Sequence, residues 1–255
     1  MTSVLIISGL DPSGGAGFIA DVRVVERHGL RAVGAISALT EQTTAGVRAV
    51  SSPGAELLAA QLTALLADVE VAAGKIGLLA DEDCCAAAAE ALALTGAPVV
   101  WDPVLRASAG DVALFRGDPR RALALLADHV ALVTPNLAEA EVLCGFPVRD
   151  RDGMRRAAAD LAARGVACLV KGGHLGGAAG AADVLAAAGR LIEIEGEMVP
   201  GGERVHGTGC ALSTAIACRL AGGDDLETAC RGAAAWLRDR LREPVTSGRG
   251  RPSVM

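Results

Sequence analysis

The chain has 255 residues, a net charge of −6 and 51% hydrophobic residues, which allows one large domain or two small ones with a substantial core. Aromatic residues make up only 2% of the chain and tyrosine is absent, so stacking platforms for nucleic-acid bases are not expected. The sequence has no basic run and no apolar run of membrane-spanning length, which argues against a nucleic-acid-binding protein and a membrane protein. Because the chain begins directly in a predicted strand, we expect a cytoplasmic protein.

Strand-like and helix-like stretches alternate along the chain. Strands are predicted at residues 4–8, 33–38, 73–76, 98–102, 130–134 and 167–171. Helices are predicted at residues 15–28, 56–68, about 82–95, from 119 onward, 137–144 and 152–164. Capping residues support three of these helix starts, at Asp81, at Asp118 and at Asn136.

The pattern changes in the last third of the chain. Residues 183–187 and 190–195 predict a β-hairpin with a glycine-containing turn, and two further helices follow, the last at residues 226–242. Repeated strand–helix units predict an α/β fold with a mostly parallel sheet between two helix layers. We expect one domain over residues 1–242 and a polar, loosely held tail over residues 243–255. Ligands of such sheets bind at the carboxyl ends of the strands.

A glycine-rich turn, His206-Gly207-Thr208-Gly209-Cys210, runs directly into an apolar helix. Its glycines allow a tight bend and a close approach of the backbone to a ligand. The first amides of a helix have no internal partners, so this end suits a phosphoryl group or another anion. Cys210 would lie beside that anion, where we expect its thiol to have a lowered pKa. The alternative is a plain helix start with a buried cysteine.

Polar residues also follow the first two predicted strands. The turn from Gly9 to Gly17 resembles a P-loop but lacks the lysine and the following Ser or Thr. Asp21 lies one helical turn after Gly17 and could accept a hydrogen bond from a hydroxyl or an amine, or simply be solvated. Gln42, predicted in a loop, offers a donor and an acceptor that match the edge of an amino-heterocycle, or is a surface residue.

Charged residues follow three later strands. Asp102 and Glu139 could hold Mg²⁺, which usually takes one or two carboxylates together with phosphates. Glu139 also stands three residues after Asn136, as in a capping box, and both roles can coexist. Lys171 could contact a nucleotide phosphate. Alternatively, it simply stands where a strand ends and a loop begins. All these signals fall at one edge of the predicted sheet, which favours a functional site over the separate alternatives.

Taken together, these motifs resemble the hydroxymethylpyrimidine/phosphomethylpyrimidine kinases, the thiamine-pathway members of the ribokinase-like superfamily. The resemblance extends in order from Ser3 to about Trp236. The matching motifs are Ile7-Ser-Gly-Leu-Asp-Pro-Ser-Gly-Gly-Ala-Gly17 with Ala20-Asp21, Ser37-Ala-Leu-Thr-Glu-Gln42, Lys75-Ile-Gly-Leu78, Asp102-Pro-Val, Thr134-Pro-Asn-x-x-Glu139, Lys171-Gly-Gly-His and His206-Gly-Thr-Gly-Cys210. Their combination is specific, although each motif alone is not.

The resemblance implies a three-layer α/β/α sandwich, a homodimer, and phosphorylation of 4-amino-5-hydroxymethyl-2-methylpyrimidine and then of its monophosphate, with ATP and Mg²⁺. It implies that the pyrimidine contacts Gly9, Asp21 and Gln42 and packs on Leu78. It places Cys210 where related sugar kinases have an aspartate base, with Gly207, Thr208 and Gly209 as the anion hole. The residues assigned to the nucleotide are Lys171, Asn136 and Arg106, and those assigned to the metal are Asp102 and Glu139.

Three segments depart from the family pattern. Residues 200–205 replace the usual Asn-Thr pair, Arg106 to Gly110 replace a Lys- or Thr-Ser-Gly pattern, and Ala211 stands where a hydroxyl residue is common. These changes fall on the nucleotide side, so weaker nucleotide binding or one weak phosphorylation step is expected. A pyridoxal kinase and a non-catalytic pyrimidine-binding sensor are the alternatives. Gln42 and Cys210 favour the pyrimidine kinase.

Overall fold

The computed structural model describes residues 1–107, 112–173 and 181–255. A nine-stranded sheet forms its centre, in the order β3-β2-β1-β4-β5-β6-β7-β8-β9. The strands are β1 (Ser3–Leu10), β2 (Arg31–Thr43), β3 (Gly46–Ser51), β4 (Ala73–Ile76), β5 (Val99–Trp101), β6 (Leu132–Val133), β7 (Ala167–Val170), β8 (Ala181–Ala187) and β9 (Arg190–Gly196). Strands β2, β1, β4, β5, β6 and β7 pair in parallel, whereas β3 and the β8–β9 hairpin pair antiparallel at the two edges.

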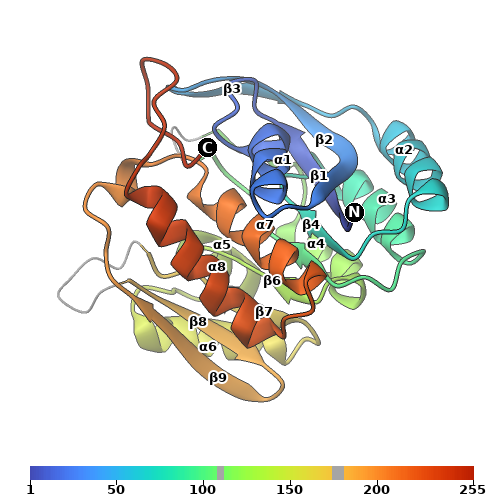
Figure 1. Cartoon of the computed structure of the whole chain (residues 1–255). Coiled ribbons are helices and arrows are strands. Elements are labelled where there is room, and N and C mark those ends of the chain that lie inside the picture. Colours follow the sequence, from blue (N-terminus) through green and yellow to red (C-terminus); the bar gives the residue numbers. More distant parts are fainter. Residues whose placement is uncertain (108–111, 174–180) are drawn as a thin grey trace.

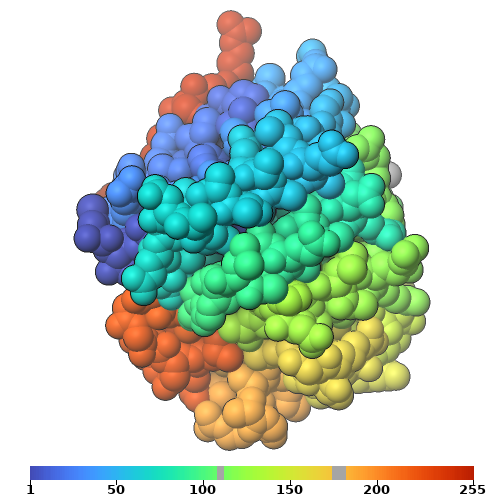
Figure 2. Space-filling model, turned by 90° about the vertical axis from the view of Figure 1, so that its right-hand side faces the viewer, coloured from blue at the N-terminus to red at the C-terminus, as the bar shows by residue number. Residues whose placement is uncertain are grey.

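Helices cover both faces of this sheet. They are α1 (Gly17–Arg27), α2 (Ala55–Asp68), α3 (Glu82–Leu92), α4 (Pro119–Leu126), α5 (Leu137–Cys144), α6 (Arg151–Ala162), α7 (Thr208–Ala221) and α8 (Leu226–Leu241). Helices α1, α7 and α8 pack on one face (Figure 1), and α2 to α6 cover the other in consecutive bands from cyan to yellow (Figure 2). Each face buries its own apolar cluster, so the predicted three-layer α/β/α fold is confirmed. No described helix combines the length and the apolar character needed to cross a membrane.

Local sequence signals explain most of the helix starts. Asp81, Asp118 and Asn136 are N-caps whose side chains accept backbone N–H groups, as predicted. Asn136 and Glu139 form the predicted reciprocal capping box. Helix α5 then ends at Gly145, which adopts the left-handed conformation with φ +83°. The starts of these helices, and the end of α5, are therefore encoded by residues close to them in the chain.

The N-terminal edge of the sheet differs from its prediction. Strand β2 continues through Thr43 and turns back into β3, which the sequence analysis did not predict. Gln42 therefore lies on a strand, paired with Val47, and not in a loop. The polar residues at the end of β2 gave no apolar alternation, because this part of the strand extends beyond the buried sheet.

The prediction of a loosely held tail is wrong for its final residues. Ser253, Val254 and Met255 are buried, and Val245 pairs with Ser253 in a short antiparallel bridge. The His206 N–H donates to Pro252 O over 2.7 Å, and the Val254 N–H donates to His206 O over 3.3 Å. The polar composition of residues 243–251 concealed these backbone pairings, which fix the end of the chain beside the glycine-rich turn.

Candidate active site

A cavity of about 680 Å³ opens at the carboxyl ends of the parallel strands and at the start of α7. It extends from β2 and the 9–17 turn, past Cys210, to the 197–206 segment and α8. Every residue assigned to the site from sequence lines this cavity, with the exception of Asp21. The sheet thus brings together residues as far apart in the chain as Gly9 and Cys210.

The turn before α7 has a conformation that requires glycine. Gly207 has φ +80°, and a Cβ atom there would lie 2.0 Å from Gly15 O. The first helical hydrogen bond of α7 runs from Ala211 N–H to Gly207 O, so the amides of residues 208–210 precede the helical ladder. No side chain caps this helix. Because residues 207–210 line the cavity, the start of α7 is suited to bind an anion.

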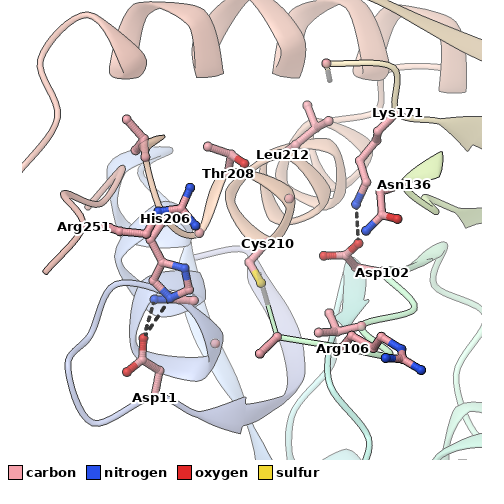
Figure 3. Close-up of a pocket in the computed structure, with 18 of the residues that line it drawn as sticks. Asp11, Asp102, Arg106, Asn136, Lys171, His206, Thr208, Cys210, Leu212 and Arg251 are labelled. Carbon is pink, nitrogen blue, oxygen red and sulfur yellow. Dashed lines mark hydrogen bonds and ion pairs between the residues drawn. The ribbon is translucent and has the colours of Figure 1, made fainter. Parts of the chain in front are cut away.

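Cys210 lies at the centre of the cavity wall, partly exposed (Figure 3). Burial raises the pKa of its thiol to about 11, because the opposing effects of the Lys75 ammonium and the Gly17 N–H are smaller. The carboxylates of Asp21 and Asp102 raise this pKa further. The predicted lowering of the thiol pKa is therefore wrong: desolvation and two nearby negative charges outweigh the Lys75 ammonium and the Gly17 N–H.

An ion pair lies beside the first turn of α7. Lys171 Nζ is 2.6 Å from Asp102 Oδ1, and both side chains are largely buried (Figure 3). Burial would lower the pKa of Lys171, but Asp102 and Glu139 raise it above its usual value. A Cβ atom on Gly209 would lie only 3.2 Å from Lys171 Nζ. Glycine at this position therefore leaves room between the lysine and the first turn of α7.

Glu139 forms the predicted capping box and also lines the cavity, as Asp102 does. Its Oε2 accepts from Asn136 N–H over 2.8 Å, while Asn136 Oδ1 accepts from Glu139 N–H over 3.0 Å. Burial raises the pKa of Glu139 to about 7, the Asp102 charge adds to this rise, and Lys171 opposes it. No cluster of three or more potential metal-binding side chains occurs among the residues that the structure describes. Two adjacent carboxylates that repel each other fit a cation such as Mg²⁺, with phosphates completing its ligands.

Asp21 lies beneath the cavity and not in its wall. Its side chain is fully buried, with Oδ2 2.6 Å from Lys75 Nζ and Oδ1 2.7 Å from Thr214 Oγ1. The predicted amine and hydroxyl partners therefore exist, but they belong to the protein itself. This position corrects the expected direct contact between Asp21 and a pyrimidine.

The opposite end of the cavity has an apolar floor and a polar rim. Leu78 lies against Gly9, where a Cβ atom would be 2.9 Å from Leu78 Cδ2. The Gln42 amide lies 3.2 Å from Thr40 Oγ1 at one end and 3.2 Å from His206 Nε2 at the other. Asn136 and the exposed Arg106 line the same cavity nearer to Lys171 (Figure 3).

Sequence reasoning missed a role for Asp11 and for the side chain of His206. Asp11 accepts from Ser13 N–H (2.8 Å), Ser13 Oγ (2.7 Å) and Ala16 N–H (3.0 Å), and its Oδ2 is 3.4 Å from His206 Nε2. Burial would raise the pKa of Asp11, but the hydrogen bonds from His206 and Ser13 lower it. The Asp-Pro-Ser-Gly-Gly sequence was a signal for such a side-chain-stabilised turn.

Two of the departures from the family pattern can be placed. Residues 202–204 form a 3₁₀ turn, and Gly202, Glu203 and Val205 line the cavity. Arg106 pairs with Ala113 in a short bridge. His174 and residues 108–110 of the altered loop lie outside the described residues.

A sequence profile of the phosphomethylpyrimidine kinases matches residues 11–255. The chain belongs to this family. It is 40% identical to the hydroxymethylpyrimidine/phosphomethylpyrimidine kinase of Rhizobium meliloti over 98% of this chain and 96% of that protein. The predicted family and its phosphotransferase activity on hydroxymethylpyrimidine and its phosphate are therefore confirmed.

Solved structures of similar proteins agree with this membership. A phosphomethylpyrimidine kinase from Clostridium difficile has a TM-score of 0.79 and 28% identity, over 94% of this chain and 100% of that one. The ADP complex of Bacillus subtilis pyridoxal kinase has a TM-score of 0.87 and 27% identity, over 99% and 96%. The phosphomethylpyrimidine kinase family thus shares its architecture with pyridoxal kinases, and the fold does not separate the two activities.

Proposed function

We propose that this phosphomethylpyrimidine kinase family member transfers the terminal phosphoryl group of ATP to the hydroxymethyl oxygen of 4-amino-5-hydroxymethyl-2-methylpyrimidine, and then adds a second phosphoryl group to the monophosphate. One observation supports this most: a single cavity contains an anion-binding helix start, a buried lysine–carboxylate pair and a polar rim suited to a heterocycle. Gln42 offers both a donor and an acceptor to the aminopyrimidine edge, while Leu78 packs against the ring.

We assign the nucleotide to the end of the cavity near Lys171. The Lys171 ammonium contacts phosphate oxygens as a point charge, and Asn136 and Arg106 lie beside it in the cavity lining. Asp102 and Glu139 would hold Mg²⁺, which supplies charge neutralisation to the phosphates. The amides of residues 207–210 stabilise the charge on the transferring phosphoryl group, because its transition state is loose and depends mainly on positioning and electrostatics.

Cys210 is assigned to the hydroxymethyl group of the substrate. With a thiol pKa of about 11, Cys210 is protonated at neutral pH in the free protein and is not a preformed thiolate base. In a loose transition state the alcohol loses its proton late, so strong base catalysis is not required. We therefore propose that Cys210 orients the acceptor oxygen at the start of α7, and that turnover depends on this contact more than pyrimidine affinity does.

Pyridoxal phosphorylation is the second candidate, supported by the likeness to the Bacillus subtilis pyridoxal kinase. Purified protein incubated with ATP, Mg²⁺ and either compound would distinguish the two by the mass of the product. Pyrimidine diphosphate would support the proposal, and pyridoxal phosphate alone would replace it by the second candidate. Ligand binding without ADP formation would indicate a sensor. A homodimer is also proposed, and light scattering near twice the chain mass of 25.6 kDa would support it.

A further inference from the structure

His206 contacts the pocket through its side chain while its backbone is fixed by the end of the chain. Its N–H donates to Pro252 O and its carbonyl accepts from Val254 N–H. Its Nε2 atom lies 3.4 Å from Asp11 Oδ2 (Figure 3). The same atom is 3.2 Å from the nitrogen of the Gln42 amide. Asp11 is itself held by three further hydrogen bonds. The imidazole is therefore fixed from both sides at one end of the Gln42 side chain.

The proton on this imidazole follows from its partner. Asp11 is an acceptor at neutral pH, because an ionised carboxylate has no hydrogen to donate. The His206 Nε2 atom must then carry a proton, in the neutral ring as well as in the charged one. Two donors cannot bond to each other, so the Gln42 nitrogen placed 3.2 Å from His206 Nε2 must exchange places with the carbonyl oxygen of the same amide.

The contacts of the Thr40 hydroxyl require the same orientation of the Gln42 amide. Its hydroxyl lies 2.7 Å from Leu10 O and 3.2 Å from Gln42. A hydroxyl has one proton, and the shorter contact to a pure acceptor takes it. Thr40 Oγ1 can then only accept from Gln42, so the same exchange is required here: the NH₂ group takes the place of Oε1 beside Thr40. An amide keeps its shape when its oxygen and nitrogen exchange places, so these two neighbours alone decide its direction.

We propose that His206, held by Asp11, is a positioning residue that fixes the direction of the Gln42 amide and thereby the orientation of the substrate ring. Each end of the amide uses one hydrogen-bonding position on the protein, which leaves one acceptor and one donor for a ligand. An aminopyrimidine presents a donor NH₂ next to an acceptor ring nitrogen. With a fixed amide it pairs in a single direction, and its neighbouring hydroxymethyl group then points to Cys210. This inference rests on the proposed pyrimidine kinase activity.

Two nearly isosteric variants separate this role from a merely structural one. Gln at position 206 can place an N–H donor where Nε2 lies, whereas Asn is too short to reach it. The probes are 4-amino-5-hydroxymethyl-2-methylpyrimidine and its analogue without the 4-amino group. We expect the wild type and His206→Gln to prefer the amino compound in kcat/KM by on the order of 10⁴-fold, since a site built for a hydrogen bond rejects a ligand that lacks it. His206→Asn should lose at least about tenfold of this preference, with kcat reduced more than KM is raised.

His129→Asn is the matched control, because His129 precedes β6 and so lies at the amino ends of the parallel strands, whereas the cavity lies at their carboxyl ends. Thr40→Val removes the determinant at the other end of the amide and should also reduce the preference for the amino compound, which provides a second test if a position-206 variant does not fold. Wild-type preference in both His206→Asn and Thr40→Val would overturn the inference. Absence of pyrimidine phosphorylation by the wild type would instead remove the proposed function, and the inference with it.

Discussion

Lys75 Nζ lies 2.6 Å from Asp21 Oδ2 with neither side chain exposed to solvent. This ion pair joins β4 to α1 directly beneath Cys210, and the Thr214 hydroxyl adds α7 to the same cluster. Burial would lower the pKa of Lys75, but Asp21 and its other neighbours raise it above the usual range. Lys75 therefore remains charged in the core, and its pair with Asp21, together with Thr214, connects three elements that form the floor of the site.

Removing one member of this pair should destabilise the protein strongly. Lys75→Met leaves a buried carboxylate without its counter-ion, for which we expect a loss of about 3–5 kcal/mol in the free energy of unfolding. Urea unfolding monitored by circular dichroism measures this loss. The double variant Lys75→Met/Asp21→Leu removes both charges and should recover part of the stability. A double variant no more stable than Lys75→Met would show that the uncompensated charge is not the cause.

The conformation of Gly207 gives a second prediction. Gly207→Ala places a Cβ atom 2.0 Å from Gly15 O at a φ of +80°. The turn must then move, which separates the first amides of α7 from the rest of the cavity. We expect kcat/KM to fall by about 100-fold or more, as for other losses of oxyanion-type donors, and steady-state kinetics measures it.

Gly223 offers the control for this substitution. It also has a positive φ, +93°, but a Cβ atom there meets nothing within 4 Å. Gly223→Ala therefore introduces the same backbone strain, about 1 kcal/mol or more, without the clash. Equal activity of the Gly207→Ala and Gly223→Ala variants would contradict the proposed role of the turn.

Features encoded by near neighbours in the chain were predictable from sequence. The caps at Asp81, Asp118 and Asn136 each depend on residues two or three positions away. The six parallel strands of the sheet were likewise visible as short apolar runs. Most of the assigned site residues consequently lie around one cavity, because parallel strands place their carboxyl ends together.

Features that depend on distant partners were not predictable in this way. Lys75, which pairs with Asp21, is 54 positions away from it in the chain. His206 pairs with Pro252, near the end of the chain. Nothing local in the sequence separates a carboxylate beneath a pocket from one that faces it. The same limit explains the error for Cys210, since the helix start was visible in sequence but the burial and the charges of Asp21 and Asp102 were not.

Glu139 should make stability depend on pH. Its pKa is about 7 in the folded protein, against about 4.5 in the unfolded chain, so between these values the folded state retains a proton that the unfolded state has lost. Its contribution is complete below pH 4.5 and is lost as the pH rises through 7, which lowers stability by up to about 3 kcal/mol. Urea unfolding at pH 5, 6, 7 and 8 measures this slope.

Glu139→Gln provides the comparison for this slope. The substituted amide retains an oxygen that can accept from Asn136 N–H, so the capping box is preserved while the titrating group is removed. We expect a flatter dependence of stability on pH between 5 and 8 in the variant. Parallel curves for the two proteins would assign the slope to another group.

The thiol of Cys210 gives the last prediction. Because its pKa is about 11, its reaction with iodoacetamide should accelerate about tenfold per pH unit from pH 7 to 9 without a plateau, since the thiolate is the reactive form. Mass spectrometry of the labelled peptide measures the rate at this site, and Cys210→Ala identifies the background from the other cysteines, most of which are buried. A plateau near neutral pH would show a preformed thiolate. It would also restore Cys210 as a general base, because a thiolate at the start of α7 could take the hydroxymethyl proton without first losing its own.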